Sequence, residues 1–208
     1  MRIITPDRKH QKRIPKVNIL IAGEGKTERI YFDHFDDGKK GYTIKFARGN
    51  DTDPLSLVKN LNNTVKRLGL DLKDGDKAFC VFDTDDCKDK EKILLEAITF
   101  AKKNKIDIIF STPSIELWFL LHYTYTTAAM TNKELLTKLK KYIPKYEKTL
   151  DVYDIVNDKL DTAIKNSKKL AEFQRKNGKF EKFSNANPYT DIYKIVEYLE
   201  EKRDYHKR

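Results

Sequence analysis

Residues 17–28, which read VNILIAGEGKTE, contain the pattern that decides the fold. A largely apolar run over 17–22 is followed by a glycine and then by the acidic segment that begins at Glu24. Such a run is typical of a strand buried on both faces of a parallel sheet. Residues 77–86, which read KAFCVFDTDD, repeat the pattern. The sequence therefore predicts two parallel strands that each end in carboxylates.

Strands and helices alternate through the first half of the chain. The apolar patterns predict strands at 17–22, 42–47, 77–82 and 106–110, and helices at 27–36, 54–68, 88–103 and 114–123. Asp53 and Pro54 are expected to open the second helix as its N-cap and first-turn residues. This alternation predicts right-handed crossovers onto a mostly parallel four-stranded sheet, which is a Rossmann-like α/β core.

The second half of the chain changes character. Helical spacing recurs at 131–143, 151–177 and 188–204, and no strand is predicted there. The segment Asn187-Pro188-Tyr189-Thr190 is interpreted as the cap of the last helix, whose apolar stripe is expected to pack on the core. The predicted organisation is a basic N-terminal arm (1–16), an α/β core (17–125) and a helical C-terminal extension that packs on the core (126–208).

The composition is that of a folded, highly charged protein. Of the 208 residues, 39% are hydrophobic and 36% are charged. No apolar stretch approaches the roughly 20 residues that cross a bilayer, and the polar N-terminus does not resemble a signal peptide, so the expected location is the cytoplasm. Cys80 and Cys87 have no histidine nearby in the sequence, which argues against a disulfide framework and against a zinc site.

The net charge of +10 is concentrated toward the two ends of the sequence. Residues 1–16 carry six basic side chains against one acidic, and residues 131–208 carry 19 against 13. The stretch between them is therefore close to neutral. Basic flanks around a carboxylate-bearing core suit an enzyme that acts on a polyanion such as DNA or RNA. A surface of solvated lysines would give the same composition.

Three charged residues, Glu24, Lys26 and Glu28, follow the first predicted strand. Glu24 is expected to be a metal ligand or a general base at the edge of the sheet, and Lys26 to lie near a phosphate. Glu28 is a secondary candidate for the same site. In the structural alternative, Thr27 caps the next helix and Glu28 interacts with its dipole. The loop lacks the spaced glycines of a Walker A motif.

Asp83 and Asp85 follow the third predicted strand. Residues two apart on an extended segment point the same way, so both carboxylates can chelate one cation. Glu24 is expected beside them, because the carboxyl ends of parallel strands share one edge of a sheet. Crowded carboxylates repel one another unless a cation neutralises them, which predicts Mg²⁺ or Mn²⁺. Asp86 is a secondary candidate that could instead cap the next helix.

Residues 111–123 follow the fourth predicted strand and contain two further candidates. Ser114 is expected to be the N-cap of a helix, and Glu116, in its first turn, either joins the site or stabilises the helix dipole. His122 is a candidate for catalysis, although a histidine in an apolar helix is more often a core residue. Arg48, after the second strand, is a candidate for contacting the scissile phosphate.

Taken together and in order, these motifs resemble those of the RloB-like family. The resemblance is carried by Glu24-Gly25 with Thr27-Glu28, by residues 82–86, by the Pro-x-x-Glu-Leu-Trp segment at 113–118, and by residues 187–190. It therefore spans nearly the whole chain. What the resemblance implies is a Toprim-type core, in a protein encoded near restriction and abortive-infection loci.

The resemblance also implies roles for individual residues. In Toprim domains a glutamate and an Asp-x-Asp pair bind Mg²⁺ for phosphodiester chemistry, and the matching positions here are Glu24, Asp83 and Asp85. Among Toprim proteins a nuclease is the closest analogy, by fold-level comparison. No dedicated ATPase domain is recognised in the sequence, so an ATPase or restriction-system protein encoded nearby is an expected partner.

The leading hypothesis is a Mg²⁺-dependent nuclease that acts in phage defence on DNA or RNA, with Glu24, Asp83, Asp85 and Lys26 as catalytic residues. The alternative is a non-catalytic nucleic-acid-binding or regulatory subunit of a restriction or abortive-infection system. A third hypothesis is phosphoryl transfer to or from a nucleotide or an RNA end. The sequence leaves the choice between DNA and RNA open.

Overall fold

The computed structural model describes residues 16–36, 38, 41–47, 53–84, 91–178 and 185–205. Several features of the sequence lie outside these described residues: the basic arm up to residue 15, Arg48, Asp85, Asp86 and Cys87. None of the helices in the described part of the chain is both long enough and apolar enough to cross a membrane.

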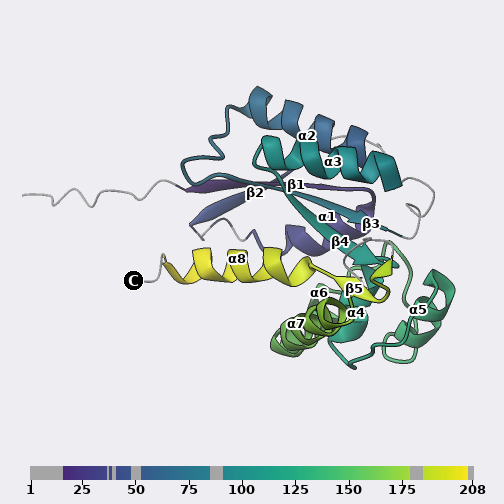
Figure 1. Ribbon diagram of the computed structural model, residues 1–208. Coiled ribbons are helices and arrows are strands. Elements are labelled where there is room, and N and C mark those ends of the chain that lie inside the picture. The colour runs from purple at the N-terminus through teal and green to yellow at the C-terminus, as the bar shows by residue number, and fades with distance from the viewer. Residues whose placement is uncertain are drawn as a thin grey trace, which may run out of the picture.

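A mostly parallel five-stranded sheet forms the centre of the molecule (Figure 1). Its strands are β1 (Val17–Gly23), β2 (Tyr42–Phe46), β3 (Lys77–Asp83), β4 (Asp107–Thr112) and β5 (Tyr189–Thr190). Their order across the sheet is β2-β1-β3-β4-β5, in which β5 alone is antiparallel to its neighbour. This arrangement confirms the Rossmann-like α/β fold that the sequence predicts.

The register of the central strands sets their carboxyl ends side by side. Gly23 at the end of β1 is aligned with Val81 of β3, and Asp83 at the end of β3 is aligned with Ser111 of β4. The residues that follow β1, β3 and β4 therefore leave the sheet at one edge, as expected for parallel strands.

Two helices, α2 (Pro54–Leu68) and α3 (Glu91–Lys103), cover one face of the sheet (Figure 1). Asp53 caps α2 as predicted, because its carboxylate accepts hydrogen bonds from the backbone N–H groups of Leu55 and Ser56, both at 3.1 Å. Gly69 ends the helix with φ of 63°, a left-handed conformation that glycine adopts without strain.

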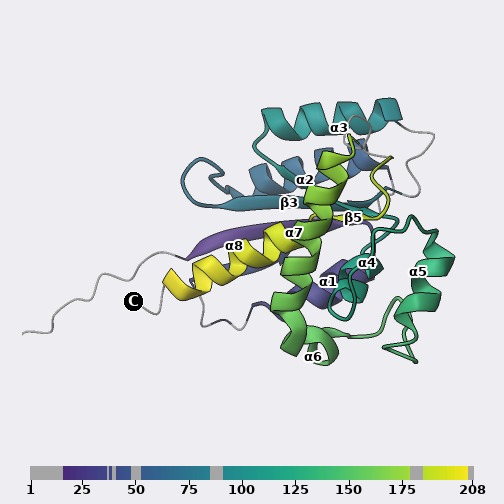
Figure 2. The ribbon, with the colours of Figure 1, turned by 60° about the horizontal axis from the view of Figure 1, so that its bottom comes forward.

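The other face of the sheet is covered by α1 (Lys26–Asp33), α4 (Glu116–Leu121) and α8 (Ile192–Tyr205) (Figure 2). Their side chains form the larger hydrophobic core, in which Trp118 is fully buried. The predicted stripe of the last helix belongs to this core, and all four of its members are 0% exposed: Ile192, Ile195, Val196 and Leu199. The sequence correctly predicts that this helix packs back on the sheet.

The rest of the C-terminal region packs around α4. It contains α5 (Asn132–Leu139), α6 (Tyr153–Val156), the 3-10 turn η2 (Asn157–Lys159) and α7 (Leu160–Lys176). Its buried side chains, such as Leu135 and Leu170, share the core of Trp118. The single helix predicted over 151–177 is therefore three successive elements that change direction around Trp118.

The prediction of a four-stranded sheet with no strand in the second half of the chain is wrong, because Tyr189–Thr190 forms a fifth strand, β5, beside β4. Thr190 also acts as predicted at the start of the last helix, where its Oγ1 accepts a hydrogen bond of 3.3 Å from the N–H of Ile192. The Oγ1 of Thr190 lies 2.8 Å from the Oγ of Ser111, and the N–H of Asp191 donates to the carbonyl of Phe110. A two-residue strand is too short to show a period of two, so the sequence pattern could not reveal it.

Candidate active site

A pocket of about 370 Å³ lies at the edge where β1, β3 and β4 end. Four carboxylate residues line it, together with two lysines: Glu24, Glu28, Asp83, Glu116, Lys26 and Lys148. The first three carboxylates and Lys26 come from the two motifs that follow β1 and β3. Glu116 comes from the start of α4, and Lys148 from the C-terminal region. The structure thus brings together residues from four separate stretches of sequence.

Glu28 turns back from α1 toward the end of β1. The backbone N–H of Gly25 donates to its Oε2 at 3.2 Å, and the side chain is only 4% exposed. A Cβ atom placed on Gly23 would lie 2.9 Å from the Cβ of Glu28, which is closer than packed carbons approach. Glycine at position 23 is therefore what allows the Glu28 side chain to pack against the strand end.

Glu116 is held from two sides and is 2% exposed. The hydroxyl of Ser114 donates to its Oε2 at 2.6 Å, and the hydroxyl of Tyr146 donates to its Oε1 at 3.0 Å. The prediction that Ser114 caps α4 is wrong, because the N-cap is Ile115 and the Ser114 side chain binds Glu116 instead. These two hydroxyls fix the orientation of the Glu116 carboxylate in the pocket wall.

Two carboxyl groups of the pocket, Asp83 and Glu28, have raised pKa values. Burial raises the pKa of Asp83 well above its ordinary value, and the charges of Glu28, Glu116 and Glu24 raise it further. Burial also raises the pKa of Glu28, with a contribution from Glu116, although hydrogen bonds from backbone N–H groups oppose the rise. The four acidic groups therefore lie close enough to repel one another.

Lys148 opposes this repulsion. Its positive charge lowers the pKa of both Glu28 and Asp83. Its backbone carbonyl accepts a hydrogen bond of 2.7 Å from the hydroxyl of Thr27, which ties the Lys148 segment to the first turn of α1. Sequence reasoning missed Lys148 and also Tyr146, because both lie in a lysine-rich segment without a local motif, and Lys148 is 121 positions from Thr27.

Some of the predicted site residues line the pocket, others lie outside the described residues, and one belongs to the core. Glu24, Lys26 and Asp83 line the pocket, as do the secondary candidates Glu28 and Glu116. Asp85, Asp86 and Arg48 lie outside the described residues, so their positions stay predictions.

His122, in contrast, is a core residue and does not line the pocket. It is 1% exposed, and its Nδ1 lies 2.9 Å from the carbonyl oxygen of Trp118. Burial lowers its pKa to about 4, so the ring is neutral at neutral pH. This placement matches the interpretation of His122 as a core residue and removes it from the candidate catalytic residues.

The pocket has the donor chemistry of a site for a hard divalent cation. Carboxylate oxygens are the ligands that Mg²⁺ prefers, and four carboxylate residues line the pocket against two lysines. Within the part of the chain that the structure describes, however, no group of three His, Cys, Asp or Glu side chains is arranged to hold a metal ion. A complete set of metal ligands would need a further donor, and Asp85 is the residue that the sequence predicts for this role.

Comparison with known proteins identifies the family of the chain. Neither the curated proteins nor the solved structures give a significant match. The family model described as RloB-like protein matches residues 19–199, which is most of the chain. The match extends from β1 into α8 and includes every described residue that lines the pocket. The chain belongs to the RloB-like protein family.

Proposed function

We propose that the protein is a Mg²⁺-dependent nuclease that hydrolyses phosphodiester bonds in DNA or RNA and acts in phage defence. The observation that carries the proposal is the convergence of Glu24, Glu28, Asp83 and Glu116 on one pocket at the carboxyl edge of the sheet. Buried carboxyl groups with raised pKa values, here Asp83 and Glu28, are a recurrent feature of functional sites. Membership of the RloB-like family and the resemblance of the motifs to Toprim domains support the same reaction class.

Asp83 and Glu24 are the proposed metal-binding residues, with Asp85 as a third. When bound, Mg²⁺ would supply a Lewis acid that activates water and stabilises the charge developing on the phosphate. Glu24 is less buried than Glu28 and Glu116, which makes it the carboxylate best able to accept a proton from an attacking water. Ser114 and Tyr146 fix the orientation of the Glu116 carboxylate, which contributes negative charge to the wall of the pocket.

The two lysines are the proposed phosphate-binding residues. Lys26 and Lys148 are both exposed and both line the pocket, so their ammonium groups can reach the non-bridging oxygens of a phosphate held there. Lys148 has a second effect, since its charge lowers the pKa of Asp83 and so favours the ionised form that binds a cation.

Cleavage assays with a matched pair of variants test the proposal. Single-stranded DNA, double-stranded DNA and total RNA are incubated with Mg²⁺ or Mn²⁺ and with wild type, Asp83→Asn or Asp158→Asn. Asp158 is an exposed carboxylate that is ion-paired with Lys159. We expect Asp83→Asn to abolish cleavage and Asp158→Asn to leave it unchanged. Equal cleavage by all three proteins would place the nuclease centre elsewhere.

The second candidate function is a non-catalytic, nucleic-acid-binding or regulatory subunit. It is favoured by one observation, that no group of three carboxylates among the described residues is arranged to hold an ion by itself. Salt-sensitive nucleic-acid binding without cleavage by wild type, under all metal conditions, would support this function over the nuclease.

A further inference from the structure

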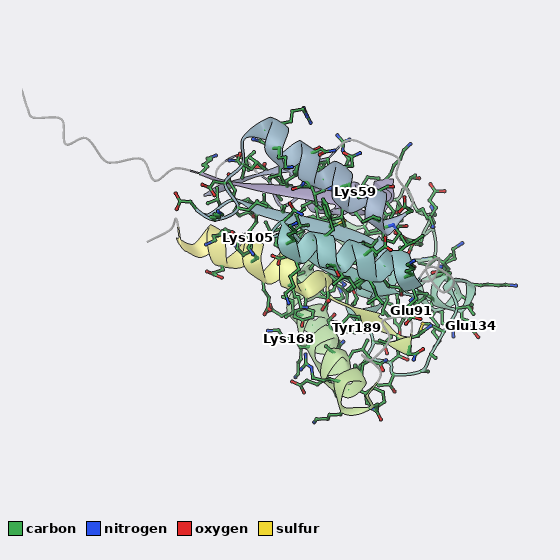
Figure 3. All side chains as sticks on the ribbon, turned by 45° about the horizontal axis from the view of Figure 1, so that its top comes forward. Lys59, Glu91, Lys105, Glu134, Lys168 and Tyr189 are labelled. Atoms are coloured by element: carbon green, nitrogen blue, oxygen red, sulfur yellow. The ribbon has the colours of Figure 1, made fainter. Side chains whose placement is uncertain are left out.

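A second hollow, of about 500 Å³, lies away from the carboxylate pocket between α3, β4, α7 and α8. Four basic residues from these elements and the α3–β4 connection line it, together with a buried tyrosine: Lys102, Lys105, Arg175, Lys194 and Tyr189. Figure 3 labels Lys105 at the end of α3 and Tyr189 on β5, on the same side of the molecule.

The shortness of β5 creates the hollow. β5 pairs only with Ser111 and Thr112, so the rest of this edge of β4 has no strand partner among the described residues. The edge is bordered instead by the end of α7 and the start of α8, which do not fill the space beside it. The hollow therefore lies beside the part of the β4 edge that β5 does not cover.

The carboxylates at the hollow are already paired. Asp107 forms an ion pair of 2.7 Å with Lys77. Asp191 forms one of 2.8 Å with Lys194 and accepts a hydrogen bond from the hydroxyl of Tyr189. The acidic groups beside the hollow therefore do not neutralise its remaining cations.

Those remaining cations are Lys102, Lys105 and Arg175, and all three are exposed. None of them forms an ion pair with a carboxylate in the described part of the chain. They come from α3, from the turn after it and from α7, so three separate elements direct positive charge to one hollow. Clustered, uncompensated cations of this kind attract the oxygens of a polyanion, and an arginine among them can bind a phosphate through two parallel hydrogen bonds.

We propose that this hollow binds the phosphodiester backbone of a nucleic acid through Lys102, Lys105 and Arg175; the proposal rests on the proposed nuclease function of the carboxylate pocket. β4 connects the two sites, because Asp107 lies at the hollow and Ser111 is aligned with Asp83. Phe110, the residue before Ser111, also lines the hollow, so a strand bound there would run along β4 up to the end at which the carboxylate pocket lies.

Binding of fluorescently labelled 20-nucleotide single-stranded DNA and RNA, measured by anisotropy at several salt concentrations, tests the proposal. The protein carries Asp83→Asn throughout, so that a cleaved substrate does not obscure binding. The variant that tests the hollow, called the groove variant below, adds Lys102→Gln, Lys105→Asn and Arg175→Gln. Asparagine replaces Lys105 because this residue has φ of 58°, which asparagine tolerates.

The control variant removes the same charge from another surface. It carries Lys59→Gln, Lys66→Gln and Arg67→Gln, three exposed positions on α2. Figure 3 shows Lys59 on the far side of α3 from Tyr189. Coincident thermal unfolding curves for both variants and the parent would establish that all three proteins are folded.

We expect the groove variant to bind at least about tenfold more weakly at fixed salt, and its slope of log affinity against log salt to fall by about two to three. The control variant should change both quantities much less, and Arg175→Lys should retain most of the slope because it keeps the charge. Equal losses in the groove and control variants would overturn the proposal. If only the groove variant lost binding but wild type cleaved no nucleic acid, the hollow would be supported as a binding site and the nuclease function would be excluded.

Discussion

The Cβ of Glu28 occupies the space where a side chain on Gly23 would begin, since a Cβ on Gly23 would lie 2.9 Å from it. The end of β1 and the first turn of α1 are therefore packed as closely as the backbone allows. This contact buries Glu28 and directs its carboxylate to the N–H of Gly25. The glycine and the glutamate of the motif act as one structural unit.

Gly23→Ala should consequently destabilise the protein. The added methyl group meets the Cβ and Cγ of Glu28, which cannot move without shifting the strand or the helix. We expect a loss of about 1–3 kcal/mol in the free energy of unfolding, measured by urea denaturation. Gly25→Ala is the matched control, because its methyl group comes no closer than 3.3 Å to any atom, that atom being the terminal Oε2 of Glu28, and should cost less. Equal costs at the two positions would contradict the packing argument.

The raised pKa of Asp83 predicts a pH-dependent stability in the absence of metal. A carboxyl group whose pKa is higher in the folded state favours folding when it is protonated, so its contribution is present below its unfolded pKa, near 3.8, and is lost as pH rises through the folded value. Asp83→Asn removes this titration. The Tm of Asp83→Asn relative to wild type, measured in EDTA, should therefore increase from pH 4 to neutral pH.

Glu28, whose pKa is raised in the same direction, should behave alike, and Glu28→Gln should show a similar trend. Asp158→Asn provides the baseline, because Asp158 is an exposed residue outside the pocket. A Tm difference between Asp83→Asn and wild type that does not change with pH would show that the crowding of carboxylates has no effect on stability.

Addition of Mg²⁺ or Mn²⁺ should reverse this destabilisation at neutral pH. A cation that binds only the folded protein raises the free energy of unfolding by about 2.7 kcal/mol when its concentration is 100 times Kd. We expect an increase in Tm with wild type and with Asp158→Asn, but a much smaller one with Asp83→Asn. A metal-induced shift that Asp83→Asn retains in full would exclude Asp83 as a ligand.

Tyr146→Phe should destabilise the pocket wall without changing its shape. The substitution removes the hydroxyl that donates to Oε1 of Glu116 at 3.0 Å and leaves that buried oxygen with one donor fewer. The expected cost is about 1–3 kcal/mol in the free energy of unfolding. Tyr142→Phe is the control, because Tyr142 is 44% exposed and stacks on Tyr123 through its ring. Equal stability of both variants would show that the Tyr146 hydroxyl is not needed.

The sequence was sufficient for the four parallel strands of the sheet and for part of the pocket. The runs at 17–22 and 77–82 predict buried parallel strands because they contain four and five consecutive apolar residues, at 19–22 and 78–82. Since the carboxyl ends of parallel strands share one edge of the sheet, Glu24 and Asp83 are then expected side by side. The sequence could not predict that Glu28 is more buried than Glu24, because the burial of Glu28 depends on the direction in which α1 leaves Gly25. Lys148 and Tyr146 reach the pocket only through tertiary packing, for which no local pattern exists.

Lys148→Gln provides the sharpest test of how the C-terminal region contributes to the site. Loss of this charge should raise the pKa of Asp83 and Glu28 further, because Lys148 lowers both. The loss of stability with rising pH in EDTA should then become larger than in wild type, and cleavage should fall because a phosphate-binding cation is missing.

Lys145→Gln is the matched control, since Lys145 is exposed in the same segment but does not line the pocket. Thr27→Val should reproduce part of the Lys148→Gln effect, because it keeps the ammonium group but removes the hydrogen bond that ties the Lys148 segment to α1 beside the pocket. If Lys145→Gln and Lys148→Gln gave the same pH profile and the same cleavage rate, the influence of Lys148 would be a general effect of net charge. A difference confined to Lys148→Gln and Thr27→Val would instead make the C-terminal region part of the active site.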